Sequence, residues 1–115
     1  MECWNLNKID APDGTRDPVV LYSDDAGRAV MIALSPGQEL GEHQVKERAF
    51  VVVVDGTITV EGGGETKTCS IGSLLTFAPN ERHAVRSEDG ARILMLLAPW
   101  PGEGHFYADE RAASR

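Results

Sequence analysis

Two histidines, His43 and His83, are the residues of this 115-residue sequence with the widest chemical range. A neutral imidazole can hold a divalent metal, hydrogen-bond a small ligand or act as a general base, and a protonated imidazole attracts an anion. Two neutral imidazoles alone would bind a metal weakly, because nothing in that pair offsets the metal's charge. The pair therefore favours a pocket for a small ligand over a tight metal centre.

Other candidate groups lie apart from this pair. Glu47 and His105 are conceivable further metal ligands, although neither has the support of a motif. The polar stretch 46–48 that contains Glu47 is predicted to be a solvated turn. Cys3 and Cys69 form no Cys-x-x-Cys pattern, so each is predicted to be a reduced, half-buried thiol.

The elements that must position these groups are predicted to be strands. Gly and Pro interrupt the sequence at short intervals, and the segments between them are too short for ordinary helices. A hairpin is predicted from 19–22 and 29–34. A second is predicted where Asp55-Gly56 joins the β-branched runs 50–54 and 57–61, because Asp-Gly is a strong hairpin signal. Gly-rich residues 62–64 predict another hairpin turn, and further strands are predicted over 66–71, 73–77, 83–87 and 92–98.

This series of roughly nine or ten strands predicts an all-β jelly roll. The chain is long enough for one domain, which we place at residues 1–107, followed by a polar tail at 108–115. The segment 50–54 is apolar on both faces, which a strand with one solvated face would not be. The sequence therefore predicts that a second copy covers this strand in a homodimer.

Charge and hydropathy narrow the partners and the location. The chain has 18 acidic against 11 basic residues and a net charge of −7, which repels nucleic acid and anionic membranes. Its start has no basic region followed by an apolar one, and no stretch approaches the ~20 apolar residues of a membrane span. We therefore expect a cytoplasmic protein without nucleic acid or membrane partners.

The spacing of glycines and histidines resembles that of the cupin family. Gly37, His43 and Gly56 fit the frame of its first motif, Gly, five residues, His-x-His, three residues, Glu, six residues, Gly. Gly72 and His83 fit the second motif, Gly-x5-Pro-x-Gly-x2-His-x3-Asn. The resemblance implies a small single-domain cupin, a double-stranded β-helix closed into a barrel.

The resemblance also implies an incomplete metal site. Metal-binding cupins use both histidines and the glutamate of the first motif together with the histidine of the second. In this chain Val45 and Ala49 replace one histidine and the glutamate, so only His43 and His83 remain as ligands. The expected cofactor is none or a weakly held divalent metal. The second motif departs from the family at Ala78, Asn80 and Ser87, of which Asn80 is a mild change because Asn tolerates positive φ.

Strand alternation and the cupin frame together predict a mostly apolar ligand pocket. Its predicted lining consists of His43, Val45, Ala49, Val51, Val53, His83 and Val85. The predicted function is a small barrel that binds a small molecule without redox chemistry. Three alternatives stay open: a metal-dependent cupin enzyme of dioxygenase or isomerase type with a third ligand, a metal-free acid-base enzyme that uses the two histidines, and a structural or interaction module.

Overall fold

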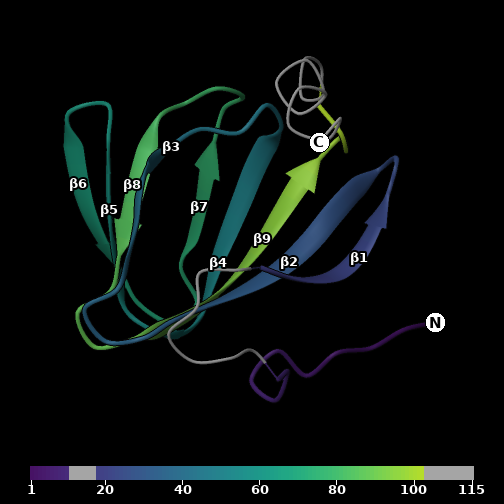
Figure 1. Cartoon of the computed structure of the whole chain (residues 1–115), viewed down its shortest axis with the longest axis horizontal. Coiled ribbons are helices and arrows are strands. Elements are labelled where there is room, and N and C mark those ends of the chain that lie inside the picture. The colour runs from purple at the N-terminus through teal and green to yellow at the C-terminus, as the bar shows by residue number, and fades with distance from the viewer. Residues whose placement is uncertain (11–17, 103–115) are drawn as a thin grey trace, which may run out of the picture.

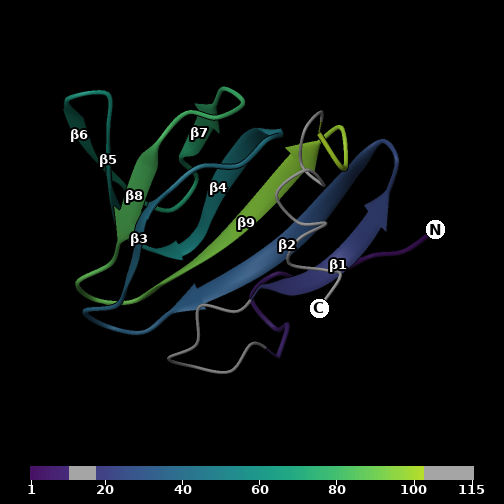
Figure 2. The same cartoon turned by 45° about the horizontal axis from the view of Figure 1, so that its top comes forward.

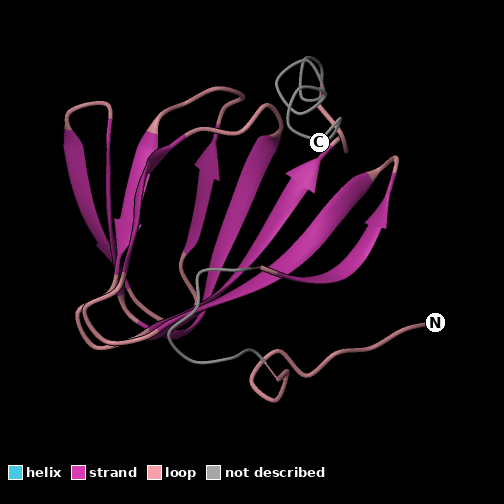
Figure 3. Ribbon diagram, in the orientation of Figure 1, coloured by secondary structure: helices cyan, strands magenta, loops and turns pink. Residues whose placement is uncertain are grey.

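The computed structural model describes residues 1–10 and 18–102, and within these it contains nine strands in two antiparallel sheets (Figures 1 and 3). The five-stranded sheet has the order β1 (Val19–Asp24), β2 (Gly27–Leu34), β9 (Ala91–Ala98), β4 (Arg48–Gly56), β7 (Leu74–Phe77). The four-stranded sheet has the order β3 (Glu39–His43), β8 (His83–Arg86), β5 (Ile58–Gly62), β6 (Glu65–Cys69). The predicted all-β fold is confirmed. The predicted boundary between domain and tail lies outside the described residues.

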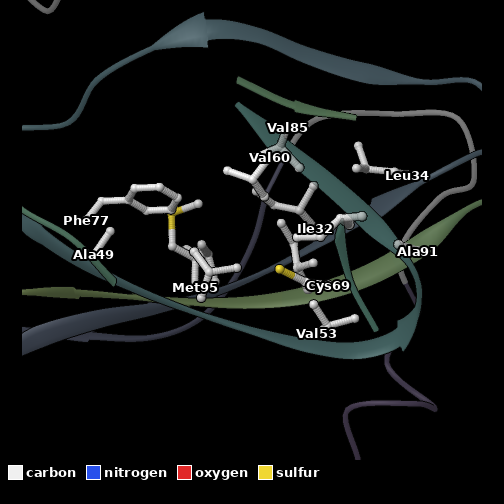
Figure 4. Packing of buried hydrophobic residues seen from close by; sticks show 14 of the residues in the cluster. Ile32, Leu34, Ala49, Val53, Val60, Cys69, Phe77, Val85, Ala91 and Met95 are labelled. Carbon is white, nitrogen blue, oxygen red and sulfur yellow. The ribbon is translucent and has the colours of Figure 1, made fainter. Parts of the chain in front are cut away.

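The hydrophobic core lies between the two sheets, which approach each other at one end of the strands and diverge at the other (Figure 1). Successive side chains of β4 point to opposite faces of the sheet. Ala49, Val51 and Val53 point inward and are at most 2% exposed, whereas the residues between them are half-buried. Figure 4 shows how this face meets side chains of the other strands. The core cluster consists of Val30, Ile32, Leu34, Ala49, Val51, Val53, Ile58, Val60, Cys69, Phe77, Val85, Ala91, Ile93, Met95 and Leu97.

Two of the predicted hairpins are confirmed. Strands β1 and β2 pair antiparallel, and in their turn Asp24 Oδ1 accepts a hydrogen bond from the Ala26 N–H at 2.8 Å. Strands β5 and β6 also pair, through a turn in which Gly63 and Gly64 have φ of 58° and 79°. These positive φ values explain the glycine-rich sequence, since residues with a Cβ rarely adopt them.

The prediction of a hairpin at Asp55-Gly56 is wrong. Strands β4 and β5 belong to different sheets, so the dipeptide carries the chain from one sheet to the other. Gly56 has φ of 76°, and a Cβ there would lie 2.1 Å from the Gly90 carbonyl oxygen. The glycine is required because the connection between β8 and β9 crosses closely at this corner.

The N-terminal segment, residues 1–10, runs past the five-stranded sheet (Figures 1 and 2). Arg92 of β9 donates hydrogen bonds to the carbonyl oxygens of Leu6, at 2.7 Å, and Ile9, at 2.6 Å. Ala33 lies directly opposite Arg92 in the sheet and is 5% exposed, although it does not belong to the core cluster. The segment therefore covers part of the outer face of the five-stranded sheet. Within residues 1–10 and 18–102, no helix is long and apolar enough to cross a membrane.

Candidate functional site

His83 stands at the start of β8 and is 2% exposed. Its Nδ1 lies 3.0 Å from the Glu81 carbonyl oxygen, and its ring stacks on Phe77 with centroids 3.9 Å apart and planes 8° apart. Because a carbonyl oxygen only accepts, the hydrogen bond places the proton of the neutral ring on Nδ1. The imidazole is thus fixed in both orientation and tautomer.

The two motif histidines lie on neighbouring strands. His43 ends β3, and its backbone is in register with that of His83 in the β3–β8 pair. The side chain of His43 lies outside the part of the chain that the structure describes. Strand pairing therefore brings the two cupin-like motifs together at the backbone.

The apolar residues predicted to line the pocket lie in or against the hydrophobic core. Ala49, Val51 and Val53 project inward from β4, Val85 from β8 is 4% exposed, and half-buried Val45 packs against the same cluster. Side chains fill the space around them. None of the five lines the cavity between β6 and β7 that is described below.

Glu47 is a buried carboxylate, so the prediction of a solvated turn over 46–48 is wrong at this position. Its side chain is 1% exposed, and Oε2 accepts a hydrogen bond from the Gly102 N–H at 2.7 Å. The segment after β9 folds back over the start of β4 so closely that a Cβ on Gly102 would lie 2.7 Å from the Lys46 carbonyl oxygen. The Pro-Trp-Pro-Gly sequence at 99–102 follows β9 directly and forms this segment.

A cavity of about 520 Å³ opens between β6 and β7, which are the edge strands of the two sheets. Its apolar wall includes Val60, Leu75 and Phe77, all of which belong to or pack against the core cluster. The remaining lining residues are Gly62, Glu65, Lys67, Cys69, Ser73, Leu74, Thr76 and Glu81. Motif spacing could not find this lining, because most of it comes from strands that carry no motif histidine.

The charged groups of the cavity are three exposed side chains. Lys67 Nζ lies 3.8 Å from Glu65 Oε2, an ion pair between side chains that are 68% and 71% exposed. Glu81 Oε1 accepts a hydrogen bond from the Ala78 N–H at 2.9 Å, which holds this carboxylate in place.

Cys69 is free and buried, whereas Cys3 is free and exposed. The prediction of two half-buried thiols is correct in their reduced state and wrong in their burial.

Two facing antiparallel sheets with this connectivity define a double-stranded β-helix. The chain belongs to the cupin family, because the cupin domain model matches residues 30–98, more than half of its length. This confirms the resemblance that the motif spacing carries. No curated protein matches the chain in sequence.

Solved structures with the same fold share little sequence with this chain. A protein with a double-stranded β-helix domain from Klebsiella pneumoniae has a TM-score of 0.77 at 17% identity, covering 89% of this chain and 93% of that one. An RmlC-like cupin from Desulfovibrio desulfuricans has a TM-score of 0.76 at 23% identity, covering 86% and 97%. KdgF from Halomonas sp. has a TM-score of 0.68 at 20% identity, covering 71% and 78%. At these identities the likeness shows the fold.

The residues that the structure describes do not fit the metal site that the cupin resemblance implies. Val45 and Ala49 carry no donor atom where that site has an imidazole and a carboxylate. Among the described side chains, which do not include those of residues 11–17, 41–43 or 103–115, no group of three or more His, Cys, Asp or Glu could hold a metal ion.

Proposed function

We propose that this cupin binds a small molecule in the cavity between β6 and β7 and performs no redox chemistry there. The observation that carries the proposal is the cavity itself, whose volume of about 520 Å³ suits a small organic ligand. Val60, Leu75 and Phe77 give it an apolar wall, and polar side chains make up much of the rest of the lining. An apolar wall can hold the hydrocarbon part of a ligand while polar groups orient it.

His83 supports the cavity wall from behind in this proposal. Phe77 lines the cavity on one side and stacks on the His83 ring on the other. The Glu81 carbonyl fixes the imidazole, so the imidazole in turn fixes the phenyl ring. Because His83 is 2% exposed, it does not touch the ligand itself in this proposal. It acts on the ligand by holding Phe77 in place.

Uncharged 2-phenylethanol, followed by two-dimensional NMR of the full chain, tests the binding proposal. We expect shifts of the amides around Leu75 and Phe77. Leu75→Trp should weaken binding at least about ten-fold, because the larger side chain fills the cavity. Val20→Trp is the matched control, since Val20 is 49% exposed on β1, outside the cavity. Absence of shifts at millimolar probe, or equal binding by the two variants, would overturn the proposal.

Elemental analysis of protein purified without chelators tests the proposed chemistry. We expect well below one transition metal per chain, because Val45 and Ala49 leave the family's ligand set incomplete. The comparison is with a variant that carries both His43→Ala and His83→Ala. Near-stoichiometric metal that the double variant loses would instead support the metal-dependent enzyme with a third ligand.

We also propose that the protein is a homodimer. On the outer face of the five-stranded sheet, Phe50 pairs with Leu96 and Val52 with both Leu94 and Leu74. Leu74 and Leu96 are 62% and 39% exposed. A second copy that packs on this face would remove these apolar side chains from water.

Sedimentation velocity checks the dimer. Leu96→Lys should shift the wild-type dimer to monomer, because it places a charge on the buried face. Ile71→Lys is the control, since Ile71 is 65% exposed in the turn between β6 and β7. A monomeric wild type, or dissociation of both variants alike, would reject this interface.

A further inference from the structure

The cavity between β6 and β7 has two unlike walls. On the β7 side, Leu75 and Phe77 present apolar surface. On the β6 side, Lys67 lies opposite Val60 and Glu65 lies opposite Gly62 in the β5–β6 pair. An apolar body that lies against the first wall therefore has charged groups of the second wall within reach.

Gly62 lines this cavity at a point where another strand passes closely. A Cβ there would lie 3.0 Å from the Arg82 carbonyl oxygen and 3.5 Å from the His83 Cβ, so the residue is glycine because β8 passes closely. Glu65, its partner in the β5–β6 pair, lines the cavity as well. Glu81, from the turn before β8, also lines the cavity.

The charges of the lining do not balance. Among the described residues that line the cavity, Lys67 is the one cation, and it is paired with Glu65. The Glu81 carboxylate adds a second negative charge, and the hydrogen bond from the Ala78 N–H fixes its position. The excess negative charge is thus local and held in place, and the net charge of −7 on the whole chain has the same sign.

We infer that the ligand of this cavity carries a protonated amine on an apolar body, an inference that rests on the proposed function. The apolar body lies against Leu75 and Phe77, and the ammonium group lies toward Glu81. A purely anionic ligand, such as a carboxylate or a phosphate ester, would meet two carboxylates and one ammonium that is already paired. The cavity therefore discriminates against anions.

Three probes with one phenyl body and different head groups test the inference: 2-phenylethylamine, 2-phenylethanol and 3-phenylpropionate. By NMR titration at low salt, the amine should bind about two- to five-fold more tightly than the alcohol, the range expected for an exposed ionic contact. The acid should bind more weakly than the alcohol. The preference for the amine should shrink at 0.5 M NaCl, because salt screens exposed charges.

Glu81→Gln should remove most of the preference for the amine over the alcohol, measured as the ratio of the two affinities within the same variant. Glu88→Gln is the matched control, because it removes one exposed carboxylate outside the cavity. Equal binding of amine and alcohol, tighter binding of the acid, or an equal effect of the two variants would overturn the inference and leave the proposed function standing. Failure of all three probes to bind would overturn both.

Discussion

The space between the two sheets is filled in one region and open in another. Under β4 and β9, the side chains of Val53 and Ile93 lie directly opposite each other and are 1% exposed. Between β6 and β7, the same space forms a cavity of about 520 Å³. In the described sheets β4 has a neighbour on each side, whereas β6 and β7 each have one. Side chains close the interior where strands continue on both sides and leave it open where the sheets end.

The motif position of the family and the cavity lie in these two different regions. The position of the motif glutamate is Ala49, which pairs with Phe77 and lies in the packed core. Phe77 links the two regions, because it belongs to the core cluster, stacks on His83 and lines the cavity. The position of the motif glutamate and the cavity are therefore one residue pair apart in the sheet, Ala49 in the packed core and Phe77 on the cavity wall.

The largest effect is expected from a large-to-small substitution in the filled region. Ile93→Ala should lower the free energy of unfolding by about 2–5 kcal/mol, because it removes buried methyl groups and leaves a void. Leu75→Ala, on the wall of the open region, should cost less than half as much, since the site is already open to water. Urea denaturation measures both. Equal losses would mean that the two regions are packed alike.

The sequence predicts much of the fold because alternation and turn chemistry act locally. The pattern of Ala49, Val51 and Val53 predicts an inward face, and the structure places all three in the core. Asn80 is accepted in place of glycine, and the structure gives it φ of 66°. Asp55-Gly56 shows the limit of such local signals. The same dipeptide can form a hairpin turn or connect two sheets, and here β4 and β5 lie in different sheets because of contacts that are distant in sequence, such as that of Gly56 with Gly90.

The candidate site was harder to predict because it depends on long-range packing. The motifs identify His43 and His83 in the sequence, and the structure places them in register on paired strands. It does not reveal that side chains fill the space around Ala49, or that the edges of two sheets leave a cavity beside Lys67 and Leu75. These outcomes follow from where strands end in three dimensions, which alternation along one strand does not contain.

Two carboxylates accept hydrogen bonds from backbone N–H groups, one in buried and one in exposed surroundings, so their contributions to stability can be compared. Glu47 accepts from Gly102 in a buried setting, and Glu81 accepts from Ala78 in an exposed one. Glu47→Ala should destabilise the fold by about 1–3 kcal/mol, because the buried N–H loses its acceptor without gaining water. Glu81→Ala should change stability by less than about 0.5 kcal/mol, because water replaces the carboxylate. Thermal unfolding of the two variants checks the order, and a larger loss for Glu81→Ala would contradict it.

The two thiols give a smaller test of the same contrast. Cys3 is exposed, whereas Cys69 is 9% exposed at the base of the cavity. An aromatic disulfide reagent should modify Cys3 at once and Cys69 at least about ten-fold more slowly, since access controls the reaction as well as thiolate content. Both should react together in denaturant. Cys3→Ser isolates the slow thiol, and equally fast labelling would show that the cavity opens widely at Cys69.

The smallest effect is expected at the opposite end of the five-stranded sheet, on the surface of β1. Tyr22 donates a 2.5 Å hydrogen bond to Asp24 Oδ2. This bond raises the pKa of Tyr22 above 10.0 and lowers the pKa of Asp24 below 3.8. The contribution of Tyr22 to stability is therefore complete below pH 10.0 and is lost as the pH rises through its folded-state pKa. The contribution of Asp24 is present above pH 3.8 and is lost as the pH falls through its folded-state pKa.

Absorbance at the phenolate band reports this bond directly. In a Tyr107→Phe background, which leaves Tyr22 as the single tyrosine, the titration midpoint should lie above 10.0. Asp24→Asn should move the midpoint back toward 10.0, because it removes the negative charge that disfavours phenolate. Both groups are exposed, so salt should narrow the difference between the variants. A midpoint that Asp24→Asn leaves unchanged would mean that the hydrogen bond between Tyr22 and Asp24 does not persist in solution.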